Sequence, residues 1–137
     1  MIILVEKNSP FFDVSKAEFY FAENRQNLDD VNGFSGLLKA ADCWNVYNNA
    51  GYVGTLFVYL AQDGRRYVGG YALRHRHKEC VEALRRVCAG YKQLWADTRH
   101  LNAVICLKEA GFKWANRKKR LLKYSRQRKD FCITQSA

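Results

Sequence analysis

Long apolar runs are missing from this chain of 137 residues, although 48% of its residues are hydrophobic. A helix that crosses a bilayer needs about 20 consecutive apolar residues, and no charge-free run approaches that length. Residues 1–5 also lack the basic start and the small-residue cleavage site of a signal peptide. The sequence therefore predicts a protein without a membrane span, and we expect residues 1–5 to form a first strand.

Paired cysteine motifs are absent as well. The five cysteines are odd in number, and none belongs to a C-x-x-C pair, so neither a disulfide framework nor a zinc knuckle is indicated. His75, His77 and Cys80 have a spacing that could supply three metal ligands, but no fourth ligand lies nearby. We expect no metal site, and we expect most cysteines to be reduced thiols in the core.

The chain has no internal repeat, no linker and no low-complexity segment. Its 137 residues are enough for one hydrophobic core and too few for two comfortable domains. We therefore predict a single domain over residues 1–125. The basic segment that follows, residues 126–137, is expected to extend from it as a flexible tail.

Strand-like and helical patterns alternate along this domain. The runs 52–60 and 67–73 flank Asp63-Gly64, a pair that favours a tight hairpin turn, and they should form the centre of a sheet. Apolar residues at helical spacing predict helices over 78–89 and 99–110. Shorter segments add strands at 1–5, 94–96, 112–114 and 120–124, a helical region after Ser9-Pro10, a polar bend over 24–33 and a helix over 34–41. The order predicts an α/β (α+β) fold with a mixed, mostly antiparallel sheet flanked by helices.

Residues 91–112 carry the most specific pattern in the chain. The apolar run 94–96 suits a buried strand, and the side chains of Asp97 and Thr98 can accept hydrogen bonds from the first free N–H groups of a helix that starts near Arg99. Gly111 can adopt the left-handed conformation that ends such a helix. Strand, cap, helix and stop thus follow one another within a short segment.

This pattern resembles the second half of the GNAT N-acetyltransferase fold, in which a strand leads into a helix that ends at a Gly-Phe pair. The resemblance covers Ala103 and Gly111-Phe112, with His100 at a position where the family often has asparagine. Leu107 occupies the position of the family's common tyrosine, which can protonate the departing thiolate, and leucine has no proton to give. With this leucine and a Leu-Trp strand, the segment looks most like the small GNAT-like internal virion proteins of short-tailed phages.

The resemblance implies an acetyl-coenzyme A site at the link between the strand 67–73 and the next helix. In the family, a glycine-rich Q/R-x-x-G-x-G/A turn lets backbone N–H groups approach the pyrophosphate. Here the link contains no glycine and consists of Arg74, His75, Arg76, His77 and Lys78. These five side chains can attract phosphate by charge, without a preformed backbone cradle. We therefore expect no bound cofactor, and acetyl-coenzyme A at these residues if the protein is active.

Two further residues are candidates for catalysis or substrate contact. Asp97, at the end of a predicted strand, has a carboxylate that could act as a general base or could cap the following helix. His100 could orient a substrate or simply lie exposed in the first helical turn. Six aromatic residues are expected in the sheet, where some could stack on a ligand at the open strand ends: Trp44, Tyr47, Tyr52, Tyr59, Tyr67 and Tyr71.

Acidic residues are absent from the segment 113–129, which carries nine basic ones and nearly accounts for the formal net charge of +10. A cationic hairpin and tail interleaved with aromatic residues suit contact with nucleic-acid phosphate. The alternatives are a solvated edge that discourages strand pairing, or a contact with an acidic protein. The nine candidate contact residues are Lys113, Arg117, Lys118, Lys119, Arg120, Lys123, Arg126, Arg128 and Lys129.

Two functions remain open from the sequence. One is a GNAT-fold virion or assembly protein of phage type, with weakened or lost acetyl transfer and a basic surface that contacts DNA or another virion protein. Such a protein would be made in the host cytoplasm and could enter the virion. The other is an active N-acetyltransferase that transfers acetyl from coenzyme A to an amine. The sequence leaves the oligomeric state open.

Overall fold

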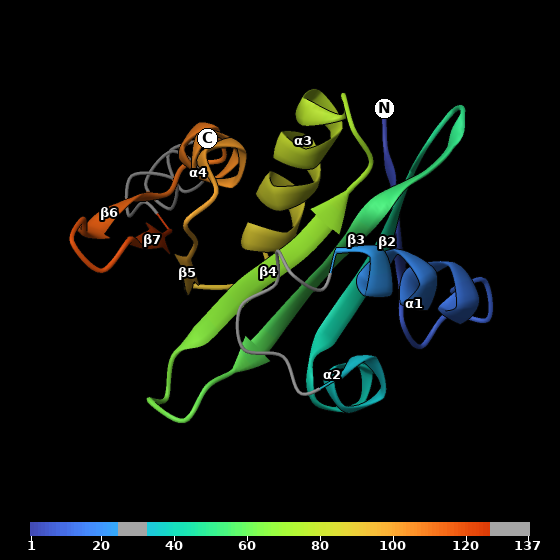
Figure 1. Cartoon of the computed structure of the whole chain (residues 1–137), viewed down its shortest axis with the longest axis horizontal. Helices are drawn as coiled ribbons and strands as arrows, with labels where there is room; N and C mark the ends of the chain where they lie inside the picture. The colour runs from blue at the N-terminus through green and yellow to red at the C-terminus, as the bar shows by residue number, and fades with distance from the viewer. Residues whose placement is uncertain (25–32, 127–137) are drawn as a thin grey trace, which may run out of the picture.

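A seven-stranded sheet with two helices on each face makes up the described part of the chain, residues 1–24 and 33–126 of a computed structural model (Figure 1). The strands are β1 (Ile3–Glu6), β2 (Asp42–Asn48), β3 (Gly51–Leu60), β4 (Arg66–Ala72), β5 (Gln93–Asp97), β6 (Lys113–Asn116) and β7 (Leu121–Ser125). The helices are α1 (Val14–Glu23), α2 (Phe34–Ala40), α3 (His77–Cys88) and α4 (Leu101–Glu109). The strand order is β1-β2-β3-β4-β5-β7-β6, and only β4 and β5 are parallel neighbours. The predicted α+β fold with a mostly antiparallel sheet is confirmed.

The central hairpin forms as the sequence predicts. β3 and β4 pair antiparallel from Leu60 opposite Arg66 onward. Gly64 has a φ of 83°, which glycine tolerates without cost, and the Asp63 carboxylate accepts the backbone N–H of Arg65 at 2.9 Å. The Asp-Gly pair therefore fixes both the turn and the strand register.

Alternation along β3 separates the two faces of the sheet. Val58 points into a cluster with Val68, Leu84 and Leu94 beneath α3 and α4. Its neighbour Phe57 belongs to the opposite cluster, beneath α1 and α2. Since side chains alternate between faces in a strand, β3 and β4 join the two helical layers at the centre of the molecule.

Strand β2 is the element that the sequence pattern did not delimit, although Trp44 and Tyr47 were expected in the sheet. Its central residue Asn45 is fully buried. The Asn45 Oδ1 accepts the Thr55 hydroxyl at 2.8 Å, and its amide donates to the carbonyl of Asp13 at 3.2 Å. A buried asparagine with partners on other elements interrupts the apolar pattern that reveals a strand in sequence.

Helix boundaries depart slightly from the expectations. α4 begins at Leu101 rather than near Arg99, with His100 as its N-cap residue, and the Thr98 hydroxyl accepts the N–H of His100 at 3.1 Å. The predicted end of this helix at Gly111 is confirmed, because Gly111 has a φ of 110°. The predicted polar bend falls largely on residues 25–32, outside the described residues. Among the described residues, no helix has the length and apolar character that a membrane crossing requires.

Thr55 offers a test of the buried polar network. Replacing it with valine removes the hydroxyl that bonds Asn45 and also lies 2.6 Å from the Tyr52 hydroxyl, leaving buried polar atoms without a partner. We expect Thr55→Val to lower the free energy of unfolding by about 1–3 kcal/mol in urea titration. Thr55→Ser keeps the hydroxyl and should cost less. Equal losses in both variants would show that the hydroxyl contributes no stability.

Candidate functional site

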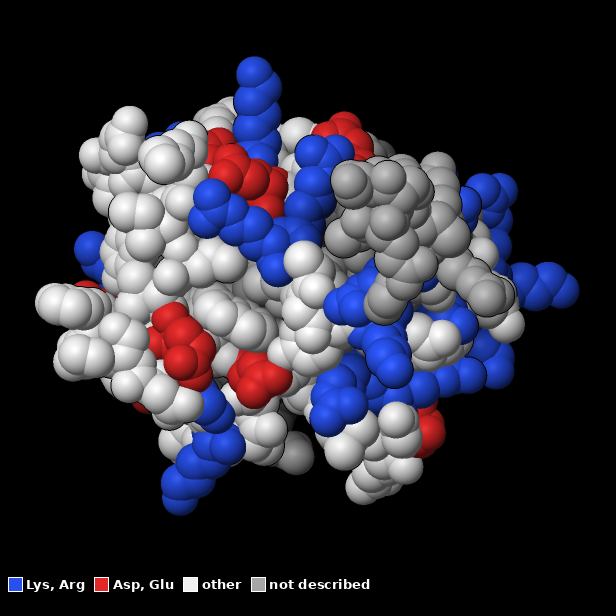
Figure 2. Space-filling view, turned by 180° about the vertical axis from the view of Figure 1, so that it is seen from behind, with Lys and Arg blue, Asp and Glu red and all other residues white. Residues whose placement is uncertain are grey.

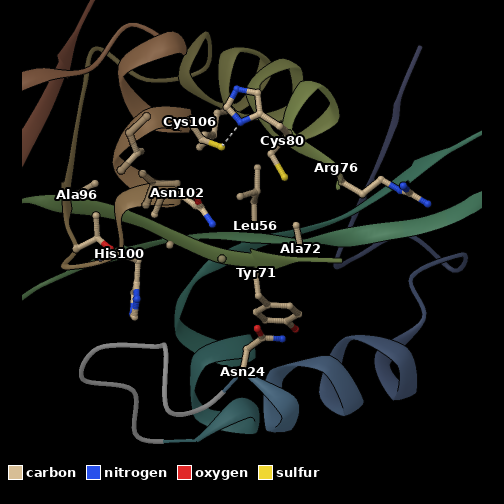
Figure 3. A pocket seen from close by; sticks show the side chains of 18 of the residues that line it. Asn24, Leu56, Tyr71, Ala72, Arg76, Cys80, Ala96, His100, Asn102 and Cys106 are labelled. Atoms are coloured by element: carbon tan, nitrogen blue, oxygen red, sulfur yellow. Dashed lines mark hydrogen bonds between the residues drawn. The ribbon is translucent and has the colours of Figure 1, made fainter. Parts of the chain in front are cut away.

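The parallel neighbours β4 and β5 part soon after they meet. Their ladder has one residue pair, Tyr67 opposite Trp95. Beyond it a cavity of about 670 Å³ opens between the later residues of the two strands (Figure 3). β4 lines one side of it through residues 68–72, and β5 contributes Ala96 and Asp97. A cavity of this size matches the range of small-molecule and cofactor sites.

Two helices complete the walls of the cavity. Cys80 and Leu84 of α3 line it, and α4 contributes Asn102, Ala103, Ile105, Cys106 and Leu107. Figure 3 shows Cys80 and Cys106 on one side of the β4 ribbon and Tyr71 with Asn24 on the other. The Tyr71 hydroxyl donates to the carbonyl of Ala17 in α1, so this tyrosine is engaged on the face away from α4.

Four of the five predicted phosphate-contact residues, Arg74 to His77, line the cavity. His77 and Lys78 belong to the first turn of α3 rather than to the link, which makes the link shorter than the sequence suggested. Lys78 is exposed and is not among the lining residues. The structure therefore brings most of this cluster to the cavity and leaves Lys78 outside it.

His75 supplies the backbone conformation that glycine commonly provides in such a turn. Its φ is 61°, in the left-handed region, which is disfavoured for most residues although histidine is among the less rare exceptions. The link thus turns without a glycine, but an imidazole stands where a glycine would leave open space.

Leu107 lies at the boundary between the core and the cavity. Leu107 is 7% exposed, packs into the core beneath α3 and α4, and also lines the cavity. Asp97 is the last residue of β5, is exposed and lines the cavity together with His100. Asp97 stays a candidate base by position.

The sequence analysis missed a relay between α3 and α4. The Cys106 sulfur lies 3.2 Å from Nδ1 of His77, and Nε2 of His77 lies 2.8 Å from Oε2 of Glu109. The cysteines were expected to be mostly reduced core thiols, and His77 was considered only with its neighbours in sequence, including His75 and Cys80. The three-residue spacing of Cys106 and Glu109 places them on one helix face, but no sequence signal pairs that face with His77. Within the described residues no group of three His, Cys, Asp or Glu side chains is placed to hold a metal ion.

Both cysteines at the cavity are protonated thiols at neutral pH. Burial raises the pKa of Cys80 to about 12. Burial, followed by the negative charge of Glu109, raises the pKa of Cys106 above its ordinary value. A base is therefore needed to turn either thiol into a nucleophile.

The basic residues gather on the side of the molecule that carries β6 and β7 (Figure 2). Lys118 and Lys119 are exposed on the turn between these strands. Arg128 and Lys129 lie outside the described residues. The other described members are Lys113, Arg117, Arg120, Lys123 and Arg126.

Some of these cations also have structural roles. Arg120 donates through Nε to the carbonyl of Thr98 at 3.2 Å and has a φ of 56°. Arg126 donates its backbone N–H to Lys92 and its guanidinium to the carbonyl of Ala89. Arg120 therefore also serves the structure of the turn, and Arg126 itself is hydrogen-bonded to the domain.

Two tryptophans carry cations over their rings. The guanidinium carbon of Arg65 lies 4.0 Å from the Trp95 ring centre, and the Lys123 ammonium lies 4.8 Å from it. Arg117 and Arg120 lie 5.5 and 5.4 Å from the Trp114 ring centre. These contacts hold part of the basic surface in place against the sheet.

No protein-family model matches the chain, and no curated protein sequence matches it. Solved structures do match its fold. The aminoglycoside acetyltransferase AAC(6')-Ib in complex with coenzyme A and kanamycin has a TM-score of 0.64 at 11% identity, over 98% of this chain and 99% of that one. The N-acetyltransferase PseH of Campylobacter jejuni in complex with acetyl coenzyme A gives 0.63 at 13% identity, over 93% and 100%. An N-acetyltransferase from Staphylococcus aureus Mu50 gives 0.64 at 14% identity, over 91% and 97%.

The chain therefore has the GNAT acetyltransferase fold, as the segment 91–112 indicated. Identities of this size establish the architecture alone, because one fold can carry several functions. The functions of the cavity and of the basic surface depend on the residues that form them.

The left-handed His75 gives a testable consequence for stability. Glycine adopts this backbone conformation freely, so we expect His75→Gly to keep the free energy of unfolding within about 1 kcal/mol of the parent or to raise it. His75→Val should destabilise the protein clearly, since β-branched residues resist a positive φ. Urea titration of the parent and of the two variants gives the order of their free energies of unfolding. A valine variant as stable as the glycine variant would contradict the left-handed link.

Proposed function

We propose that the cavity between β4 and β5 receives the thioester arm of an acyl-coenzyme A and that the protein transfers the acyl group to an amine with reduced efficiency. The observation that carries this proposal is the parting of β4 and β5 after the single pair Tyr67–Trp95, beside a cavity of about 670 Å³. Structures of the same fold were solved with coenzyme A or acetyl coenzyme A, which supports the assignment of the cavity.

Charge supplies the attraction for the phosphates in this proposal. Arg74 and Arg76 line the cavity, and the N-terminus of α3 adds the positive end of a helix dipole. Glu79 lies in the first turn of the same helix, and its negative charge opposes this attraction. Its Oε2 accepts a hydrogen bond from Nδ2 of Asn48 at 2.9 Å. The His75 side chain also occupies the turn that glycine would leave open. The site therefore favours weak and less selective binding.

The proton transfers account for the reduced efficiency. An amine must lose a proton before or during its attack on the thioester, and the Asp97 carboxylate at the cavity is our candidate base. The departing thiolate needs a proton in return, and Leu107 has none to give. A general acid contributes about 10²–10⁴ in rate, so its absence slows transfer without abolishing binding.

Calorimetry with acetyl-coenzyme A tests the binding step. We expect the parent to bind more weakly than micromolar at physiological salt. We expect His75→Gly to bind about tenfold more tightly, the equivalent of about 1.4 kcal/mol, because the pyrophosphate gains space. His75→Gln keeps a bulky side chain and is the matched control, with the affinity of the parent. If none of the three proteins binds, the cavity is not a coenzyme A site.

Steady-state turnover with a panel of amines tests the chemical step. Leu107→Tyr restores an acid at that position and should raise turnover about a hundredfold, the lower end of a general acid's contribution. Asp97→Asn should then reduce it while leaving the coenzyme A affinity unchanged. Micromolar binding and fast turnover by the parent would contradict the reduced activity that we propose.

A second function is favoured by the basic surface on β6 and β7. We propose that this surface contacts DNA or an acidic virion partner, as expected for a phage-type virion or assembly protein. The exposed Lys118 and Lys119 and the concentration of cations on one side support it (Figure 2). Phosphate contact of this kind releases counterions and depends little on base sequence.

A pair of charge-matched variants separates this contact from general electrostatics. Lys118→Ser with Lys119→Ser removes two exposed cations from the β6–β7 turn. Lys16→Ser with Lys39→Ser removes two exposed cations from α1 and α2, which belong to another part of the molecule. The first variant should bind DNA more weakly and lower the slope of log affinity against log salt by up to about 2, since each phosphate contact contributes about 0.9.

The second variant should behave as the parent does in the same fluorescence-anisotropy titration. If both variants lose DNA affinity equally, the loss comes from the lower net charge of the protein and not from the β6–β7 turn. If the parent itself does not bind DNA at low salt, the basic surface has a protein partner instead.

A further inference from the structure

Cys106, His77 and Glu109 form a linear chain of hydrogen bonds at the cavity wall. Cys106 and His77 both line the cavity, and the bond between them is the dashed line at Cys106 in Figure 3. Glu109 follows on the far side of the imidazole, 2.8 Å from Nε2. A nucleophile, a base in contact with it and a carboxylate that orients the base are the parts of an activated thiol.

The two bonds of the imidazole fit one tautomer. The Glu109 carboxylate accepts a hydrogen bond, so Nε2 of His77 carries the proton and donates it. Nδ1 is then the unprotonated nitrogen, and it faces the Cys106 sulfur at 3.2 Å. Nδ1 can therefore take the proton of the Cys106 thiol.

The thiol also has a proton to give. Burial and the charge of Glu109 raise the pKa of Cys106, so the resting group is a thiol and not a thiolate. Activation has to occur by proton transfer to His77 during the attack, as it does for a serine nucleophile. The relay suits a substrate that enters the cavity and reacts there.

We propose that Cys106 is a nucleophile that takes the acyl group from a thioester in this cavity, a step that rests on the proposed function for the identity of the cavity. The Cys106 sulfur bonds to the carbonyl carbon while Nδ1 of His77 accepts its proton. The bond between that carbon and the leaving sulfur then breaks, and the leaving thiolate takes the proton back from Nδ1. The products are S-acyl Cys106 and a free thiol, with no net oxidation or reduction.

A thioester is the substrate class that this site fits. Thiol and leaving group are chemically alike, so one proton passed through His77 serves both halves of the exchange. The proton that Leu107 cannot supply is the one that His77 has just taken, and Cys106 directly precedes Leu107 on α4. In transfer to Cys106 the relay thus supplies the proton for the departing thiolate, whereas in direct transfer to an amine no such proton has been placed on His77.

A purely structural role makes a different prediction. The His77–Glu109 pair links α3 to α4, and Arg85 of α3 also donates to the Glu109 carbonyl at 2.9 Å. If the pair only joins the helices, its loss should change stability but not the reactivity of Cys106. The rate of acylation separates the two roles.

The test uses the full chain and the acetyl thioester of N-acetylcysteamine, which has no nucleotide or pyrophosphate. Intact-mass spectrometry should show the gain of one acetyl group, and peptide mapping should assign it to Cys106. His77→Gln should slow acylation about a hundredfold or more, the range that a general base contributes. Cys43→Ala removes a buried thiol on the other face of the sheet, outside the cavity, and is the control, with an unchanged rate.

Glu109→Gln provides a second variant if His77→Gln folds poorly. It keeps a hydrogen-bond acceptor but removes the charge that stabilises the imidazolium, so it should slow acylation by a smaller factor, and Cys106→Ala should abolish it. The proposal is overturned if Cys106 is not acylated, or if it is acylated equally fast in folded His77→Gln and Glu109→Gln proteins. Acylation without calorimetric binding of acetyl-coenzyme A would reject the proposed function alone. Binding without acylation would reject this inference alone.

Discussion

The candidate site depends on the single parallel pairing in the sheet, between β4 and β5. Parallel neighbours need a crossover, and α3 supplies it, so the start of α3 necessarily lies at the end of β4. Arg65 and Lys123 over the ring of Trp95 stabilise the closed end of this pairing, next to Tyr67. Beyond it the strands are free to part. The parallel pairing of β4 and β5 thus creates the cavity. It also places at the cavity the side chains that precede α3 and those of its first turn.

The walls of the cavity are built from side chains where a glycine-rich turn would present backbone. The cavity is lined by an imidazole at His75, guanidinium groups at Arg74 and Arg76 and a thiol at Cys106. Backbone N–H groups are fixed dipoles that bind a phosphate at a defined distance, whereas long cations bind it from many positions. If the cavity binds a phosphate group as we propose, these side chains should give low selectivity for one phosphate arrangement, and the imidazole and the thiol can take part in proton transfer. The cavity is better equipped for acid–base chemistry than for a tight pyrophosphate cradle.

Local sequence signals predicted the elements that depend on local physics. Asp63-Gly64 determined the central hairpin, and Gly111 determined the end of α4, because both depend on backbone conformations that few residues adopt. β2 was not delimited because Asn45 is satisfied by groups distant in sequence, Thr55 and Asp13. The relay was missed for the same reason. Its members lie on two helices, and only the packing of α3 against α4 brings His77 to Cys106.

Leu107 belongs both to the core and to the wall of the cavity. The residue lies between the core of Leu94, Phe112 and Leu122 and the cavity, so it serves packing on one side and lines the site on the other. An apolar side chain at such a boundary adds burial to the core, worth about 1.5–3 kcal/mol for a leucine, and offers no proton to the site. Proton transfer near a departing thiolate then requires another group within reach of the same wall. In the acylation that we propose, His77, held by Glu109 and in contact with Cys106, would be that group.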